Sequence, residues 1–316
     1  MAYPLPTSLS PSKVSTFKDC ALAFRFSAID KLPEPPSMPA VKGTTVHRAL
    51  ELLFAAEPAD RTPELAQECL QEALIEMRTE EEYLGLELDD VESAKFAADA
   101  GVMVERYFTL EDPRAIRPVG LEMMLEAEVG GITVRGIIDR LEEDADGQLV
   151  VTDYKTGRTP SVQQEQSRLG GVHFYAFLCQ QVLGRIPARI QLVYLGAQPQ
   201  VITTTPSEQS VRGMERKVGA IWAAVERACE QEDFRPKKSA LCNWCAFQAY
   251  CPAFGGDPDQ ARAIAIAREA AEAERAATHG ERATSTAPSA APAVPATAAP
   301  EQATAVDLRA ADATAC

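Results

Sequence analysis

The sequence lacks the features that mark several classes of protein. No apolar run approaches the roughly 20 residues that a membrane-spanning helix requires. The first residues, "MAYPLPTSLSPSK", do not combine a basic stretch with an apolar one, as a secretory leader would. There is no internal repeat and no G-x-x-x-x-G-K-[ST] loop, which excludes ATP hydrolysis through such a loop. We therefore expect a cytoplasmic protein without membrane contact.

An excess of basic residues is also absent, because the formal net charge is −15. Taken alone, this charge argues against a nucleic-acid partner, but the acidity is local. Residues 51–100 carry fifteen Asp and Glu against three Lys and Arg, whereas 151–240 carry twelve basic side chains against eight acidic ones. The acidic segment has apolar residues at helical spacing, which is typical of a solvated helical face. The remaining surface can still be basic where a nucleic acid would bind.

The length and composition predict a folded protein of enzyme size. With 316 residues, 46% of them apolar, the chain can bury one large or two modest cores. In a reducing cytoplasm its eight cysteines would not form a disulfide framework. A tight group of cysteines would instead hold a metal or carry out redox chemistry.

Proline, glycine and capping residues predict the order of the elements. Ser10 and Pro11 predict a helix that begins there and ends near Cys20. After the break "PEPPSMP", a second amphipathic helix is expected from about Thr45 to Ala56, with His47 in its first turn. Further elements are expected as helices over 62–110, a three-stranded meander over 120–155 with turns at Gly130-Gly131 and Asp146-Gly147, a helix at 162–183, strands at 190–196 and 200–205, and a helix at 207–231.

Composition also predicts how the chain is divided. We expect a single domain over 1–256 with a helical insertion at about 58–112, followed by an Ala/Arg/Glu-rich helical extension over 257–282. The Ala/Thr/Pro-rich residues 283–316 have too little apolar surface to bury and should be disordered.

The meander holds the residues with the clearest chemical signal. If its second hairpin turns around Asp146, antiparallel partners add up to 292, and Asp139 of "GIIDR" faces Asp153 of "TDYKTG". Lys155 points to the same face. Facing carboxylates with a lysine beside them suit a hard divalent cation, with the ammonium left for a phosphate oxygen or an attacking water. The alternative is that charged residues are simply common at hairpin ends.

The order of these motifs resembles a known family. The G-x-x-x-H sequence from Gly43 to His47, the D…D-x-K arrangement on adjacent strands, and a following helix with "HFYAFL" together resemble the RecB-type exonucleases of the PD-(D/E)xK nuclease superfamily, over about residues 8–254. The resemblance implies an α/β fold, with a mixed central sheet flanked by helices.

The same resemblance implies roles for individual residues. His47, Asp139, Asp153 and the main-chain carbonyl of Tyr154 would bind Mg²⁺ or Mn²⁺, and the imidazole would favour Mn²⁺. Lys155 would assist the nucleophilic water, and Tyr175 would belong to the catalytic set. The family usually has a glutamine a few residues before that tyrosine, whereas the nearest one here is Gln166, and Gly170-Gly171 weaken the helix. The residue that positions the substrate therefore stays unassigned.

Three cysteines lie within ten residues, in the stretch "CNWCAFQAYC". Cys242, Cys245 and Cys251, with Pro252 behind them and Cys20 far upstream, supply four thiolates. From the residues alone, zinc and a [4Fe–4S] cluster both remain open. The split of one early and three late cysteines resembles the iron–sulfur branch of the family, which includes bacterial recombination nucleases and CRISPR-associated adaptation nucleases. That resemblance implies the cluster.

The other cysteines are expected to be structural or to lie in the tail. Cys69, Cys179 and Cys229 fall on apolar helical faces and are predicted core residues, whereas Cys316 ends the tail.

The expected function is that of a metal-dependent DNA nuclease, an exonuclease or flap-type enzyme of repair or recombination. Its substrate would have a single-stranded portion, and it would act alone or beside a separate helicase. Arg25, Arg158 and Lys237-Lys238 are candidates for contacts to the phosphate backbone. A non-catalytic Fe–S nucleic-acid-binding module with this fold and an iron–sulfur redox protein are the alternatives, and the complete set of acids, histidine and lysine argues against both.

Overall fold

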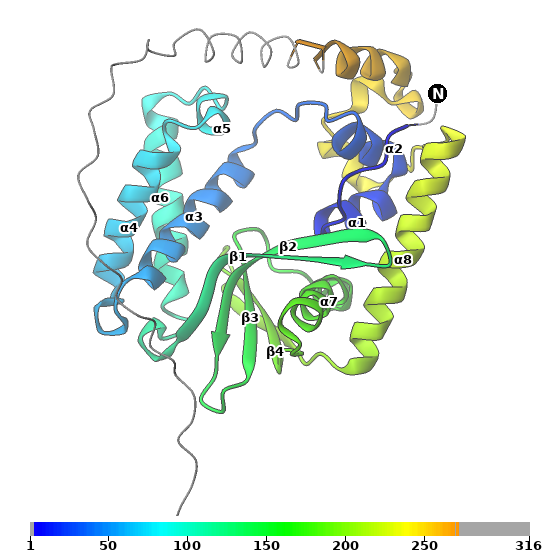
Figure 1. The fold of residues 1–316 in the computed structure, drawn as a ribbon. Helices are drawn as coiled ribbons and strands as arrows, with labels where there is room; N and C mark the ends of the chain where they lie inside the picture. Colours follow the sequence, from blue (N-terminus) through cyan, green and yellow to red (C-terminus); the bar gives the residue numbers. More distant parts are fainter. Residues whose placement is uncertain (1–2, 269, 272–316) are drawn as a thin grey trace, which may run out of the picture. The chain divides into compact units, whose positions relative to one another are not determined.

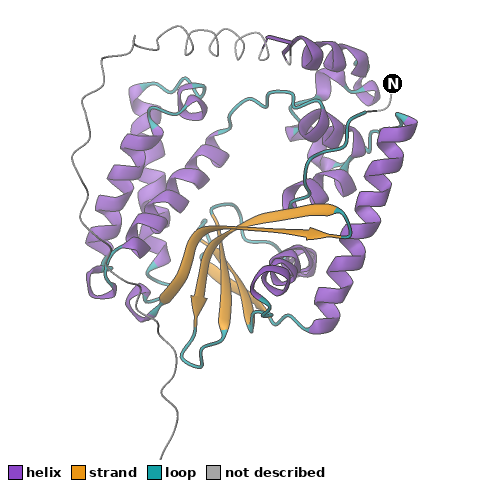
Figure 2. Cartoon of the chain, in the orientation of Figure 1, coloured by secondary structure: helices purple, strands orange, loops and turns teal. Residues whose placement is uncertain are grey.

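A five-stranded mixed sheet lies at the centre of the fold, with strand order β1-β2-β3-β4-β5 (Figures 1 and 2). The strands β1 to β3 form an antiparallel meander, β3 and β4 are parallel, and β4 and β5 are antiparallel. The strands are Arg117–Val129 (β1), Ile132–Glu143 (β2), Leu149–Lys155 (β3), Arg189–Tyr194 (β4) and Gln200–Thr204 (β5). The predicted α/β class with a mixed sheet is confirmed.

Helices cover both faces of this sheet (Figure 1). On one side, α3, α4 and α6 pack against one another, and on the other side α7 packs against β1, β2 and α8. The helices are Pro11–Asp19 (α1), Ala21–Phe24 (α2), Met38–Ala55 (α3), Pro63–Met77 (α4), Glu81–Leu84 (α5), Asp90–Tyr107 (α6), Val162–Leu183 (α7) and Glu208–Gln231 (α8). The parallel connection from β3 to β4 runs through α7, as such crossovers require.

The computed structural model describes residues 3–268, 270 and 271, without the side chains of 162–164 and 166–168. Contacts divide the chain into Met1–Ala267 and Arg268–Cys316, and the elements named here belong to the first unit. The predicted helical extension is helical over 258–268, while 272–282 and the predicted tail 283–316 lie outside the described residues. Within the described part, no helix is long and apolar enough to cross a membrane.

Two hydrophobic clusters share the sheet between them. The first joins α1, α2, α7 and α8 to one face of the strands, and the second joins α3, α4 and α6 to the other. Alternate residues of one strand enter different clusters, because side chains along a strand point to opposite faces. Leu192 belongs to the first cluster, and its neighbour Val193 belongs to the second.

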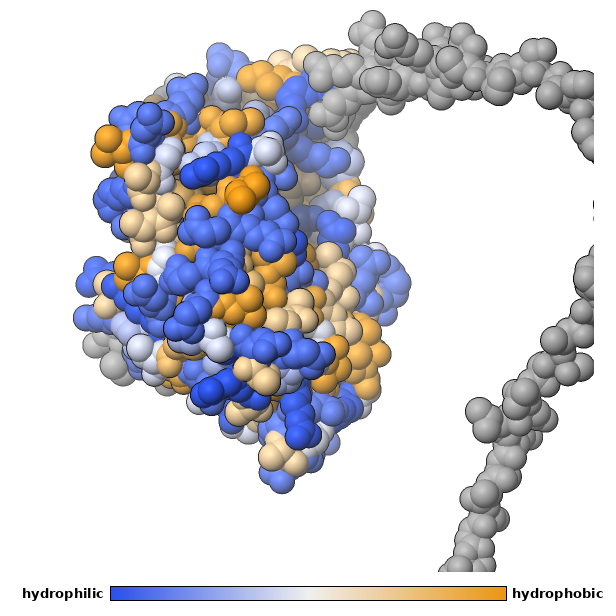
Figure 3. All heavy atoms as spheres, turned by 90° about the vertical axis from the view of Figure 1, so that its left-hand side faces the viewer, coloured by the Kyte–Doolittle hydropathy of each residue, from blue (hydrophilic) through white to orange (hydrophobic). Residues whose placement is uncertain are grey.

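The acidic segment forms the outer helices of the second cluster. Ala66, Leu70 and Ala73 of α4 are buried, whereas Glu64, Glu68 and the other glutamates of that helix lie at the surface. Figure 3 shows this side of the molecule, where hydrophilic residues dominate and apolar ones form separate patches. The segment thus has the solvated helical face that its sequence predicts.

The helix α3 begins earlier than the sequence suggests, so the predicted start near Thr45 is wrong. The Ser37 side chain accepts a hydrogen bond from the Ala40 N–H, and Pro39 fits the first turn, so the stretch that seemed to break the chain starts the helix. His47 therefore lies in mid-helix, one turn after Gly43. A Cβ atom on Gly43 would lie 3.1 Å from Thr156 Oγ1, so glycine lets α3 approach the end of β3 closely.

A buried arginine links the sheet to the end of α6. Arg140 is fully buried, and its guanidinium donates to Glu111 at 3.0 Å, to Glu142 at 2.5 Å and to Thr152 Oγ1 at 3.1 Å. It also donates to the Tyr154 hydroxyl at 2.6 Å. Because each carboxylate has a partner, the buried charges compensate one another.

We expect Arg140→Ala to lower the free energy of unfolding by about 3–5 kcal/mol, because it leaves two carboxylates buried without a counter-charge. Urea unfolding followed by circular dichroism would measure the change. Arg185→Ala is the control, because Arg185 forms an exposed pair with Glu143 and its loss should cost less than about 1 kcal/mol. Equal losses in the two variants would contradict this account.

Candidate active site

Three carboxylates occupy one row across β1, β2 and β3. Arg140 pairs with Thr152, so the predicted register of the second hairpin is confirmed, and Asp139 and Asp153 hold the next position. In the first hairpin, the pairs on either side of Glu122 place it opposite Asp139. The main-chain pairing of β2 with β3 ends at Arg140. Beyond it, the Asp139 side chain joins the two strands, because its Oδ2 accepts the Tyr154 N–H at 2.6 Å.

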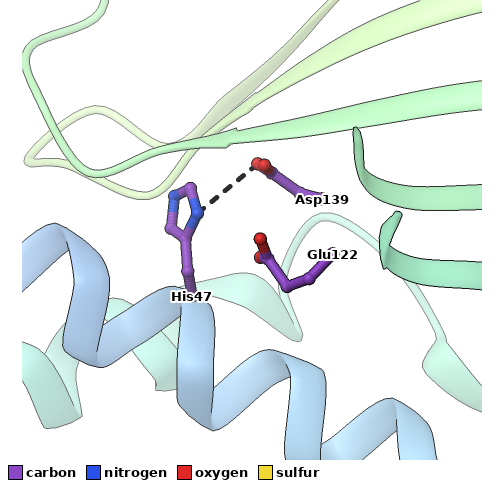
Figure 4. Close-up of side chains that lie close together, drawn as sticks. All are labelled: His47, Glu122 and Asp139. Atoms are coloured by element: carbon purple, nitrogen blue, oxygen red, sulfur yellow. Dashed lines mark ion pairs between the residues drawn. The ribbon is translucent and has the colours of Figure 1, made fainter. Parts of the chain in front are cut away.

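His47 reaches this row from α3 (Figure 4). Its Nδ1 lies 3.5 Å from Asp139 Oδ2, and its Nε2 lies 3.1 Å from the main-chain oxygen of Tyr154. Burial lowers the pKa of His47, so the imidazole is neutral at pH 7 and has a lone pair for a metal. The 3.5 Å between His47 Nδ1 and Asp139 Oδ2 is close to the separation of neighbouring ligands in an octahedral shell, which is about 3.0 Å for a cation of Mg²⁺ size.

Glu122 belongs to the same group, although the sequence analysis missed it. One ligand atom from each of His47, Glu122 and Asp139 lies within 4.8 Å of the others, and no second such trio of His, Cys, Asp or Glu occurs in the described part of the chain. The side chains converge between α3 and the strands in Figure 4. The predicted turn at Gly130-Gly131 contained the signal, because that turn pairs position 122 with position 139.

The charges of this group repel one another. Burial and the neighbouring Asp153 raise the pKa of Asp139 to about 8. Burial, followed by the charges of Glu51 and Asp153, raises the pKa of Glu122 to about 7. A cation beside these oxygens would favour their ionised forms. The arrangement is a possible acidic and histidine metal site that fits a divalent-metal nuclease.

Lys155 and Tyr175 both contact Asp153. The Lys155 ammonium forms an ion pair with Asp153 Oδ2, and the Tyr175 hydroxyl, from α7, donates to Asp153 Oδ1 at 3.4 Å. Asp153 is 4% exposed, and its Oδ2 receives no well-directed hydrogen bond from the described residues. Burial works to lower the pKa of Lys155, but Asp153 outweighs it and raises that pKa, so the lysine is charged.

A cavity of about 550 Å³ lies over this group. Its wall includes His47, Glu122, Tyr154 and Lys155, and the α3 residues Gly43, Thr44 and Arg48. Three of the six predicted residues, His47, Tyr154 and Lys155, therefore line this cavity. Asp139 contacts His47, and Asp153 contacts Lys155 and Tyr175. The side chain of Gln166 lies outside the described residues.

The four predicted cysteine ligands line a second cavity, of about 240 Å³. Cys20, Cys242, Cys245 and Cys251 are half-buried, and burial together with the other three sulfurs raises the pKa of the Cys245 thiol. Among the described residues, no three of these sulfur atoms lie within 4.8 Å of one another.

The remaining cysteines of the described chain are buried. Cys69, Cys179 and Cys229 belong to the hydrophobic clusters, as predicted, and Cys316 lies outside the described residues.

Arg25 cannot contact a nucleic acid, so that prediction is wrong. It is 5% exposed, forms an ion pair with Asp30 at 2.8 Å and donates to the Pro258 main-chain oxygen at 3.1 Å. This burial could not be predicted from local sequence, because Pro258 lies 233 residues beyond Arg25 along the chain. Arg158 and Lys237-Lys238 are exposed.

Comparison with known families gives a match over most of the chain. Residues 8–252 match the family model of the PD-(D/E)XK nuclease superfamily. A "Putative exonuclease" from Eubacterium rectale is structurally similar over 76% of this chain and 87% of its own, with 11% identity and a TM-score of 0.47. The crystal structure of SSO0001 is similar over 68% of this chain and 95% of its own, with 13% identity and a TM-score of 0.30. No curated protein matches the sequence.

The raised pKa of Asp139 predicts that cation binding depends on pH. A carboxyl group whose pKa is raised from 3.8 to about 8 on folding favours the folded state at low pH, and this contribution is lost as the pH rises through about 8. We expect Mn²⁺ to raise the melting temperature more at pH 8 than at pH 6, because at pH 6 the cation must displace a proton. Calorimetry of wild type and Asp139→Asn would test this. Equal Mn²⁺ effects at both pH values in the wild type would contradict it.

Proposed function

Because the chain belongs to the PD-(D/E)XK nuclease superfamily, we propose that it is a metal-dependent deoxyribonuclease, an exonuclease of DNA repair or recombination. The observation that carries the proposal is the position of His47 beside Asp139, at a cavity whose wall also includes Tyr154 and Lys155. The superfamily implies a nucleic-acid substrate. The order of the sequence motifs, which resembles the RecB-type exonucleases, supports DNA as that substrate and cleavage from an end.

Each residue at the row then has a role that its surroundings support. When bound, Mg²⁺ or Mn²⁺ would supply the nucleophilic water and offset charge on the phosphoryl oxygens. His47, Asp139, Asp153 and the Tyr154 carbonyl would hold the cation. Lys155 stays charged, and its ion pair with Asp153 holds the ammonium in place. The ammonium would face a phosphate oxygen or the water. The Tyr175 hydroxyl, by donating to Asp153, would orient that carboxylate.

The cysteine cavity would hold a [4Fe–4S] cluster, with zinc as the alternative. The four cysteines line one cavity, and their order of one early and three late residues resembles the iron–sulfur branch, which supports the cluster, in which each thiolate binds a different iron atom. Phosphodiester hydrolysis transfers no electrons, so the cluster would act as a structural clasp. It would join Cys20, at the end of α1, to the segment 242–251, more than 200 residues later.

The surface around this cavity supports a substrate with a single-stranded portion. Trp244 is 81% exposed and lies between two of the cysteines, with the exposed Lys237 and Lys238 in the same cavity wall. An exposed indole offers a base a surface to stack on, and nearby ammonium groups attract the phosphates. Because the sequence has no P-loop, any unwinding of a duplex would require a separate helicase.

We expect the protein to release nucleotides from end-labelled DNA when Mn²⁺ or Mg²⁺ is added, and to lose this activity with EDTA. Asp153→Asn and Lys155→Ala should each lower kcat about a hundredfold or more, because Asp153 would hold the cation and Lys155 would face the phosphate oxygen or the water. Asp146→Asn and Lys95→Ala are matched controls, since both positions are exposed and remote from the row. Wild-type rates in the first pair would refute the assignment, and DNA binding without cleavage by the wild type would indicate a non-catalytic module.

The cysteine assignment predicts that protein purified without oxygen is brown and contains about four iron atoms per chain. Cys251→Ala should lose iron and melt at a lower temperature, because the clasp is broken. Cys69→Ala should keep its iron, because Cys69 belongs to the other hydrophobic cluster. Metal analysis and thermal melting would measure both properties. A colourless wild type with one zinc ion would refute the cluster, and unchanged melting of Cys251→Ala would refute the clasp.

A further inference from the structure

Glu122 has a backbone conformation that is unusual for its position. Its φ is 42°, in the left-handed region that side chains other than glycine rarely adopt. The other described non-glycine residues with positive φ are Lys31, Glu87 and Glu232, which lie in loops or at a helix end. Glu122 alone among them lies inside a strand. Strain of this kind persists where the surroundings enforce it, and it is concentrated at functional sites.

The strained residue marks a bend in the first hairpin. Leu121 packs against the second hydrophobic cluster, whereas Met123 packs against the first, so the strand changes faces at Glu122. A glycine would meet such a bend without strain. The bend therefore explains the φ value but not the choice of glutamate.

The carboxylate of Glu122 lies in unfavourable surroundings. It is half-buried, and no described residue forms a hydrogen bond or an ion pair with it. The charges that act on it are the negative ones of Glu51 and Asp153. The cationic groups of the same cavity are already engaged, since Arg48 pairs with Glu51 at 2.9 Å and Lys155 pairs with Asp153. Glu122 thus combines a strained backbone with a carboxylate that is repelled by its neighbours, and no described partner compensates for either cost.

A second observation concerns the candidate ligand atoms around this side chain. The ligand atoms of Glu122, His47 and Asp139 lie within 4.8 Å of one another. On the far side of Asp139, the buried Asp153 Oδ2 receives no well-directed hydrogen bond. Carboxylate oxygens therefore lie on both sides of Asp139, those of Glu122 without a described partner and Asp153 Oδ2 in an ion pair with Lys155. Neutral His47 faces Asp139 from α3.

We propose that Glu122 is a further ligand of the divalent cation. It would bind the cation from β1, opposite Asp139 on β2. This inference rests on the proposed function. The cation would be a hard one, Mg²⁺ or Mn²⁺, because the added ligand is a carboxylate oxygen. It would be held by oxygens from three neighbouring strands, and the strain at Glu122 is offset when the cation binds.

Mn²⁺ binding without nucleic acid tests the proposal. Isothermal titration calorimetry should give a Kd at least about tenfold higher for Glu122→Gln than for the wild type, as for loss of a metal-site partner. Glu126→Gln is the matched control, because it removes the same charge from an exposed position four residues along β1, and it should bind as the wild type does.

Glu122→Gly separates the ligand role from the role of the bend. Glycine accepts the left-handed backbone, so this variant should melt without Mn²⁺ at the same temperature as the wild type or higher, yet show the same weakened binding. Wild-type Kd values in Glu122→Gln and Glu122→Gly would overturn the proposal, even if the variants cleaved slowly. Weak binding accompanied by early melting in both variants would also overturn it, because the side chain would then serve the fold.

The wild type and Asp139→Asn distinguish this proposal from the proposed function. If the wild type binds no Mn²⁺, both fail together. If the wild type binds Mn²⁺ and Asp139→Asn does not, while both Glu122 variants bind normally, the proposed function stands and only the role of Glu122 is refuted.

Discussion

The buried guanidinium of Arg140 fixes the strand on which the candidate site depends. It holds the hydroxyl of Tyr154, while Asp139 accepts the N–H of the same residue and His47 faces its carbonyl oxygen. All three polar groups of Tyr154 are therefore held, two of them by β2 and one by α3. Because Tyr154 lies between Asp153 and Lys155 along β3, the backbone positions of these two residues are set with it. The positions of the carboxylates in the row therefore depend on the buried ion pairs and hydrogen bonds of Arg140.

Much of this arrangement was predictable from sequence, because local patterns determine it. Alternation and turn residues predicted the meander, and the turn around Asp146 gave the register that sets Asp139 beside Asp153. The same reasoning failed where distant contacts decide the outcome. Arg25 is buried by partners that include Pro258. The start of α3 was missed for a different reason, because Ser37 and Pro39 form a local cap within a proline-rich stretch that suggested a break. Gly170-Gly171 did not interrupt α7, since neighbouring helices and strands hold it.

The candidate site shows the same limit in a sharper form. The family motif names residues by their spacing, and it contains no position for Glu122. The turn at Gly130-Gly131 pairs Glu122 with Asp139, but the bend at Glu122 is seen only in the folded chain. The raised pKa values of Asp139 and Glu122 also arise only when three strands bring their acids together. For the cysteines, spacing identified the four residues that share a cavity, but the distances between their sulfurs required the folded chain.

The row of acids lies where the two hydrophobic clusters meet, because Leu121 belongs to one and Met123 to the other. His47 stands on a helix of the second cluster, while Tyr175 and the first hairpin belong to the first. A chain that has formed one cluster alone cannot place the histidine beside the carboxylates. The candidate site therefore forms only when both clusters are folded, and the proposed nuclease would be inactive in a nascent or partly unfolded chain.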